Sequence, residues 1–108
     1  MGAAEFIENE AELEVALSSE SVLVMDCTAT WCGPCRLIAP LIDKLAAEYG
    51  DRAKVSKMDM DSNQAVGKRF GLRSIPAVLF FKEGELQETV VGAKAYEDYT
   101  ATLEKYLA

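Results

Sequence analysis

Two cysteines three positions apart, Cys32 and Cys35, are the residues of this sequence best suited to chemistry. They lie in the segment Trp31-Cys32-Gly33-Pro34-Cys35. If Cys32 stands at the amino end of a helix, Cys35 follows about one turn later on the same face, and the two sulfurs can join in a small disulfide ring. The unpaired N–H groups and the positive dipole end of such a helix favour a thiolate at Cys32. Because the thiolate is the reactive form, the segment predicts reversible dithiol–disulfide exchange.

Two other uses of this cysteine pair are a structural disulfide and half of a metal site. The sequence has three cysteines and no histidine. A four-ligand zinc site needs more donors than the one further cysteine, Cys27, readily supplies. We expect Cys27 to pack as a small hydrophobic residue in the core. The absence of histidine also excludes His-based catalysis, so redox use of the pair is the favoured hypothesis.

Asp26 is the one acidic residue in the apolar run SVLVMDCTA, residues 21–29, which precedes the cysteine pair. A carboxyl group in a buried strand is costly, and it often stays neutral through a raised pKa. Such a group is a candidate general acid–base for the proton of Cys35, acting through water. The alternative is a carboxyl satisfied by Lys57 or by a hydroxyl. Lys57 lies in the adjacent predicted strand and could pair with Asp26, although a solvated surface lysine is the other interpretation.

Length and charge limit the classes of protein to which this chain can belong. Its 108 residues predict a single domain, 1–108, with a real core. The net charge of −7 argues against nucleic acid and against anionic membrane as partners. No apolar run approaches the length of a membrane span.

The start of the chain and its use of cysteine indicate a reducing compartment. Residues 1–20 contain no apolar stretch typical of a signal peptide. They carry instead several acidic side chains: Glu5, Glu8, Glu10, Glu12 and Glu14. An odd number of cysteines is unlike a secreted disulfide framework. We therefore expect a cytoplasmic protein.

The apolar pattern predicts the elements that position these residues. Strands are expected at residues 6–7, 21–29, 53–60, 77–81 and 86–91, and helices at about 10–18, 33–49, 63–70 and 95–107. Helices between strands imply parallel crossovers, and a final hairpin through residues 82–85 adds an antiparallel edge. The prediction is an α/β fold with a mixed five-stranded sheet and four helices. The cysteine segment follows a central strand and opens a helix, where functional groups collect in such sheets.

With the cysteine segment placed, the chain resembles the thioredoxin family along nearly its whole length. Besides the segment itself, the matching residues are Asp26, Pro40, Lys57, Ile75, Pro76, Gly84 and Gly92. A C-x-x-C pair beside a βαβ pattern is typical of this family. One departure stands out, because Thr28 occupies a position where many members have a Trp packed under the active-site loop. This departure bears on the stability of that loop and on the choice of partner.

The resemblance implies a role for each matching residue. Cys32 would be the nucleophile and Cys35 the resolving thiol. It also implies a cis Ile75–Pro76 bond that exposes the backbone of Ile75 to a substrate strand. An apolar rim around the thiols would bind the target through Trp31, Gly33, Pro34, Ile75, Pro76, Gly92 and Ala93. For Gly92 a simple strand terminator is an equal alternative.

The resemblance further implies a protein-disulfide reductase, which would be a monomer without a bound cofactor. A thioredoxin reductase would supply its electrons, and its substrates would be proteins with disulfide bonds. The Gly33-Pro34 pair lacks the cationic neighbour that would favour a strong oxidant, so a reductant is expected. Two alternatives stay open: a disulfide oxidase or isomerase of the same fold, and a binding module that uses the same surface without turnover.

Overall fold

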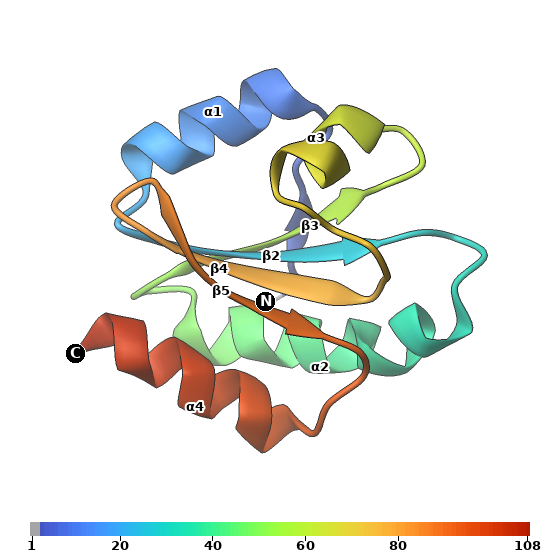
Figure 1. Cartoon of the computed structure of the whole chain (residues 1–108). Helices are drawn as coiled ribbons and strands as arrows, with labels where there is room; N and C mark the ends of the chain where they lie inside the picture. Colours follow the sequence, from blue (N-terminus) through green and yellow to red (C-terminus); the bar gives the residue numbers. More distant parts are fainter. Residues whose placement is uncertain (1–2) are drawn as a thin grey trace.

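One five-stranded sheet between two layers of helices makes up the protein, as the computed structural model of residues 3–108 shows (Figure 1). Helices α1 and α3 cover one face of the sheet, and α2 and α4 cover the other. The strands are β1 (Glu5–Phe6), β2 (Val22–Thr28), β3 (Lys54–Asp59), β4 (Ala77–Lys82) and β5 (Glu85–Val91). The helices are α1 (Glu10–Ser19), α2 (Gly33–Tyr49), α3 (Gln64–Arg69) and α4 (Tyr96–Leu107).

The order of strands in the sheet is β1-β3-β2-β4-β5, with β2 in the centre. Strands β1, β3 and β2 run parallel, while β4 and β5 are antiparallel to their neighbours. This mixed sheet with four helices confirms the predicted α/β architecture. The predicted bounds are close to those observed, although β1 begins one residue earlier than expected and α4 one residue later.

The central strand β2 is buried on both faces because its side chains alternate between two separate cores. Val22 and Val24 point toward α2 and α4 and pack there with a cluster that includes Tyr99. Leu23 and Met25 point the other way, into the cluster beneath α1 and α3. Each fully buried aliphatic side chain contributes about 1.5–3 kcal/mol relative to an exposed one. The position of β2, and of the residues that follow it, is therefore tightly fixed.

A helix cap and a hairpin turn lie where the sequence predicts them. Asn9 caps α1, because its Oδ1 accepts a hydrogen bond of 2.9 Å from the N–H of Glu12. The β4–β5 hairpin turns at Glu83 and Gly84, which both adopt left-handed φ values, 52° and 80°. Two left-handed residues give the tight turn that suits the twist of a hairpin. No helix in residues 3–108 is long and apolar enough to span a membrane.

Candidate active site

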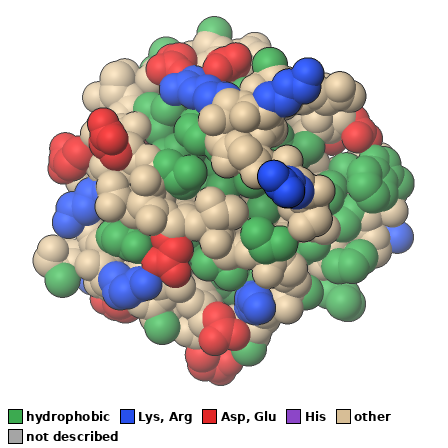
Figure 2. All heavy atoms as spheres, viewed as in Figure 1, with side chains coloured by type: hydrophobic (Ala, Val, Ile, Leu, Met, Phe, Trp, Pro, Cys, Tyr) green, Lys and Arg blue, Asp and Glu red, His purple; other side chains and the backbone are tan. Residues whose placement is uncertain are grey.

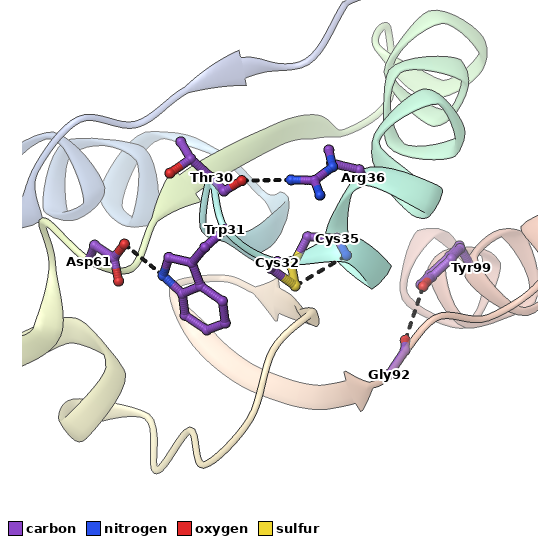
Figure 3. The surroundings of a disulfide bond; sticks show 8 residues. All are labelled: Thr30, Trp31, Cys32, Cys35, Arg36, Asp61, Gly92 and Tyr99. Carbon is purple, nitrogen blue, oxygen red and sulfur yellow. Dashed lines mark hydrogen bonds between the residues drawn. A yellow bond between two sulfur atoms is a disulfide. The ribbon is translucent and has the colours of Figure 1, made fainter.

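The cysteine pair lies at the junction between β2 and α2 and forms a disulfide bond (Figure 3). Cys32 is the N-cap residue of α2, and its Sγ accepts a hydrogen bond of 3.2 Å from the N–H of Cys35. The two Cα atoms are 5.3 Å apart. This geometry confirms the predicted helix start, where unpaired N–H groups stabilise negative charge on the Cys32 sulfur once the disulfide is reduced.

Both cysteines are buried, with Cys32 3% and Cys35 1% exposed. They form a small apolar cluster with Ala29, and Ile75 packs against it. Cys35 also lines a hollow on the far side of the loop, where Asp26 lies. The two sulfurs therefore have different surroundings, which agrees with the separate roles predicted for them.

Asp26 is a buried carboxyl group that is only 1% exposed. Its Oδ1 has no hydrogen-bond partner among residues 3–108. Burial raises the pKa of Asp26 to about 7, because water no longer stabilises the charged form. The positive charge of Lys57 opposes this shift, and the negative charge of Asp43 adds to it. Asp26 can therefore exchange a proton near neutral pH, as the sequence predicted.

Lys57 pairs with a different carboxylate from the one expected. It lies opposite Asp26 in the register of β2 and β3, but its Nζ is 3.1 Å from Oδ1 of Asp43 in α2. The predicted alternative that Lys57 or a hydroxyl satisfies Asp26 is thus wrong. The alternative of a solvated Lys57 is also wrong, because its side chain is only 13% exposed. Asp43 was not among the predicted site residues, although an acid directly after the buried residue Ile42 was a usable signal.

Thr28 leaves space beneath the active-site loop. A hollow of about 570 Å³ lies there, and its lining residues are Phe6, Glu8, Asp26, Thr28, Ala29, Thr30, Cys35, Arg36, Ala39, Lys57 and Asp59. The short side chain of Thr28 stands where the family resemblance led us to expect a Trp. The hollow is lined mainly by apolar surface, but the unpartnered Asp26 oxygen and Cys35 both border it, and its volume has room for a water between them.

The loop in front of the disulfide is held by two hydrogen bonds that the sequence did not reveal (Figure 3). Nε1 of Trp31 donates to Oδ2 of Asp61 over 2.8 Å, and the guanidinium of Arg36 donates to the carbonyl of Thr30 over 2.7 Å. The indole nevertheless stays 66% exposed. Trp31 is therefore an oriented, solvent-facing apolar surface beside the disulfide.

The predicted rim residues come from three segments of the chain, 31–34, 75–76 and 92–93. Trp31 and Ile75 line one groove next to the disulfide, and Gly33 and Pro34 are exposed in the first turn of α2. The Ile75–Pro76 bond is cis, as the resemblance implied.

The loop after β5 is tied to the start of β4. Gly92 has a φ of 91°, which favours glycine, and its N–H donates to the carbonyl of Pro76 over 2.8 Å. The hydroxyl of Tyr99 donates to the Gly92 carbonyl over 3.4 Å. Exposed Ala93 follows in the same loop. The geometry brings the rim together, and its role in binding a target stays a prediction.

Cys27 is buried and forms no disulfide, as expected. Burial raises the pKa of its thiol to about 12, and the nearby Asp26 adds to the shift. A thiol of this kind is a poor nucleophile and a poor metal ligand. No group of three or more His, Cys, Asp or Glu side chains within the described residues is placed to hold a metal ion.

A mixed five-stranded sheet that carries a C-x-x-C cysteine pair at the start of α2 defines a class of α/β protein. The family model for thioredoxin matches residues 5–105, and the chain belongs to the thioredoxin family. It is 47% identical over 94 residues to thioredoxin 1 of Synechococcus elongatus, covering 87% of each protein. It is 44% identical over 92 residues to the thioredoxin of Bacillus subtilis, covering 85% of this chain and 88% of the relative.

Plant relatives and solved structures extend this comparison. The chain is 45% identical over 95 residues to the chloroplastic M-type thioredoxin of spinach, covering 88% of this chain but 52% of that protein. It therefore spans about half the length of this relative and of the pea M-type protein. A thioredoxin mutant from Halobacterium salinarum has a TM-score of 0.91 at 31% identity, with 99% of this chain and 94% of that chain covered.

Replacing Asp26 by Asn should change how stability depends on pH. The folded-state pKa of about 7 lies above the ordinary value of 3.8, so folding holds this proton more tightly. That contribution is complete below pH about 4 and is lost as the pH rises through about 7. The free energy of unfolding is measured in urea on the oxidised protein. The difference between Asp26→Asn and the parent should shift in favour of the variant by about 4 kcal/mol when the pH is raised from 4 to 8. Asp51→Asn, which alters an exposed carboxyl, is the control, and parallel curves for Asp26→Asn and the parent would contradict the account.

Filling the hollow with Thr28→Trp should stabilise the oxidised protein. An indole there would bury apolar surface under the loop, and cavity filling of this kind adds about 1 kcal/mol to the free energy of unfolding. Thr28→Val, which keeps the shape of the side chain and leaves the hollow open, is the matched control. Denaturant unfolding is the measurement. A Trp variant less stable than the parent would show that the hollow cannot accept the ring.

Proposed function

We propose that this chain is a protein-disulfide reductase whose reduced cysteine pair donates two electrons to a target protein. The observation that carries the proposal is the placement of Cys32 at the N-cap of α2, with its sulfur accepting the N–H of Cys35. This placement stabilises a thiolate at Cys32 and keeps the second thiol within bonding reach.

The reaction has two exchange steps. The Cys32 thiolate attacks one sulfur of the target disulfide, the target S–S bond breaks, and the other target sulfur leaves as a thiolate that takes up a proton. Cys35 then loses its proton and attacks Cys32 in the resulting mixed disulfide. The Cys32–Cys35 bond forms, and the second target sulfur leaves and is protonated. The target gains two electrons and two protons, while the chain is oxidised to its disulfide.

Asp26 supports the second step as a proton acceptor for Cys35. Its raised pKa of about 7 matches a group that must take and release a proton near neutral pH. The hollow lined by both residues has room for a bridging water. Lys57 supports the charged form of Asp26 by its positive charge. Lys57 is therefore a positioning residue, with no contact to the sulfurs assigned to it.

The residues between the two cysteines favour reduction of the target over its oxidation. The Gly33-Pro34 pair places no cation between the thiols, which favours a reductant over an oxidase or isomerase. A thioredoxin reductase would return the disulfide to the dithiol, and the chain would work without a bound cofactor. We propose a cytoplasmic monomer that acts on disulfide-containing proteins.

A second candidate is a binding module that uses the same face without turnover. The groove of about 570 Å³ between Trp31 and Ile75 favours it, because such a groove can hold an extended segment of a partner whatever the state of the sulfurs.

Serine variants separate the two functions. With dithiothreitol as electron source and insulin as test substrate, Cys32→Ser should lose reductase activity by more than about 100-fold, because no nucleophile is left. Cys35→Ser should form a stable mixed disulfide with the target, visible as an adduct by mass spectrometry. Cys27→Ala, which alters only the buried thiol, should keep the reductase activity and the target binding of the parent. A Cys35→Ser protein that binds targets but never forms an adduct would support the binding module instead.

A further inference from the structure

Four basic side chains around the redox site make no ion pair within the described residues. They are Arg36, Lys68, Arg73 and Lys94, and we call them the basic rim. All four are exposed. Five of the other seven Lys and Arg residues are neutralised by ion pairs with carboxylates, namely Arg52, Lys54, Lys57, Arg69 and Lys105. The uncompensated positive charge is thus concentrated on the face that carries the disulfide.

Two members of the basic rim lie in the groove beside the disulfide. Lys68 and Arg73 line this groove together with Trp31 and Ile75. The lining includes a single acidic residue, Asp61, whose carboxylate already accepts the indole N–H of Trp31. On the right of the molecule in Figure 2, where the amino end of α2 lies in Figure 1, hydrophobic side chains predominate, with basic and acidic side chains beside them.

The remaining two members flank the site from other elements. Arg36 lies in the first turns of α2, and its hydrogen bond to the Thr30 carbonyl holds the guanidinium beside the loop of Trp31. Lys94 follows Gly92 and Ala93 in the loop after β5. Positive charge is therefore present beside the Trp31 loop and in the loop that carries Gly92 and Ala93, although the chain as a whole carries a net charge of −7.

We propose that the basic rim selects target disulfides with acidic side chains beside the cysteine that Cys32 attacks. This inference rests on the proposed reductase function and narrows its substrate class. An acidic segment gains from the rim, while the negative remainder of the surface repels it from other orientations. Such complementarity raises association rates and fixes the docking register more than it raises final affinity. A segment with basic side chains at the same positions is disfavoured for the same reason.

Three disulfide peptides test the proposal. They share one sequence with a single intramolecular disulfide and differ only in the two residues that flank one cysteine, which are Glu, Gln or Lys. Fully reduced protein is mixed with excess oxidised peptide, and the change in Trp31 fluorescence reports the second-order rate constant. At low ionic strength the Glu peptide should react about tenfold faster than the Gln peptide, and the Lys peptide more slowly. Added salt should shrink these ratios, because it screens exposed charges.

Charge reversal identifies the rim as the cause. In the double variant Lys68→Glu with Arg73→Glu, the order of the Glu and Lys peptides should invert. The ratio between peptides cancels any change in the intrinsic reactivity of Cys32. The control, Lys44→Glu with Lys82→Glu, makes the same change of charge at two cations that lie outside the rim and outside every ion pair formed among residues 3–108. It should keep the order of the parent.

The possible outcomes distinguish a failure of charge selection from a failure of the reductase function. Equal rates for the three peptides, or an order that survives reversal at Lys68 and Arg73, would overturn the inference and leave the reductase intact. The same holds if the control inverts the order, because net charge and not the rim would then be the cause. Failure to reduce even the Gln peptide would overturn the proposed function and this inference with it.

Discussion

The site depends on the junction where the buried strand β2 ends and helix α2 begins. Packing on both faces fixes β2, and four residues after its end Cys32 caps the helix. This short connection allows one element to deliver a carboxyl group into the core and the next to present a sulfur at the positive end of a helix dipole. A longer or looser connection would separate the two groups. The chemistry is therefore a consequence of the rigid strand–helix junction.

Three charged residues from three elements form the environment behind the sulfurs. Asp26 comes from β2, Lys57 from β3 and Asp43 from α2. Lys57 forms its ion pair with Asp43 and reaches Asp26 only through its field. Asp26 is thus left buried beside Cys35 with no hydrogen-bond partner for its Oδ1 within residues 3–108, a costly arrangement for a carboxyl group. A direct ion pair would have held Asp26 permanently charged, whereas this arrangement keeps it able to exchange a proton.

The sequence predicted the parts of the site that depend on local pattern. The apolar run of β2, the cap at Asn9 and the cysteine spacing each carry their own signal, and the resemblance supplied the cis Ile75–Pro76 bond. The predicted partner of Lys57 was wrong, because a contact between a strand residue and a helix residue depends on how the two elements pack, which local sequence pattern does not show. The hydrogen bond from Trp31 to Asp61 joins residues thirty positions apart, and no pattern in the sequence indicates it. The only sequence signal for the hollow beneath Thr28 was the absence of the Trp that many family members have at this position.

The most direct test of the central claim is the reduction potential of the Cys32–Cys35 pair. The protein would be equilibrated in thiol–disulfide buffers, and the fraction oxidised would be read from Trp31 fluorescence and confirmed by mass after trapping the free thiols. We expect one reversible two-electron transition at about −270 mV, the reference value for thioredoxins themselves. A transition at about −180 mV or above would identify an oxidase or isomerase instead. The absence of any transition would contradict the redox function altogether.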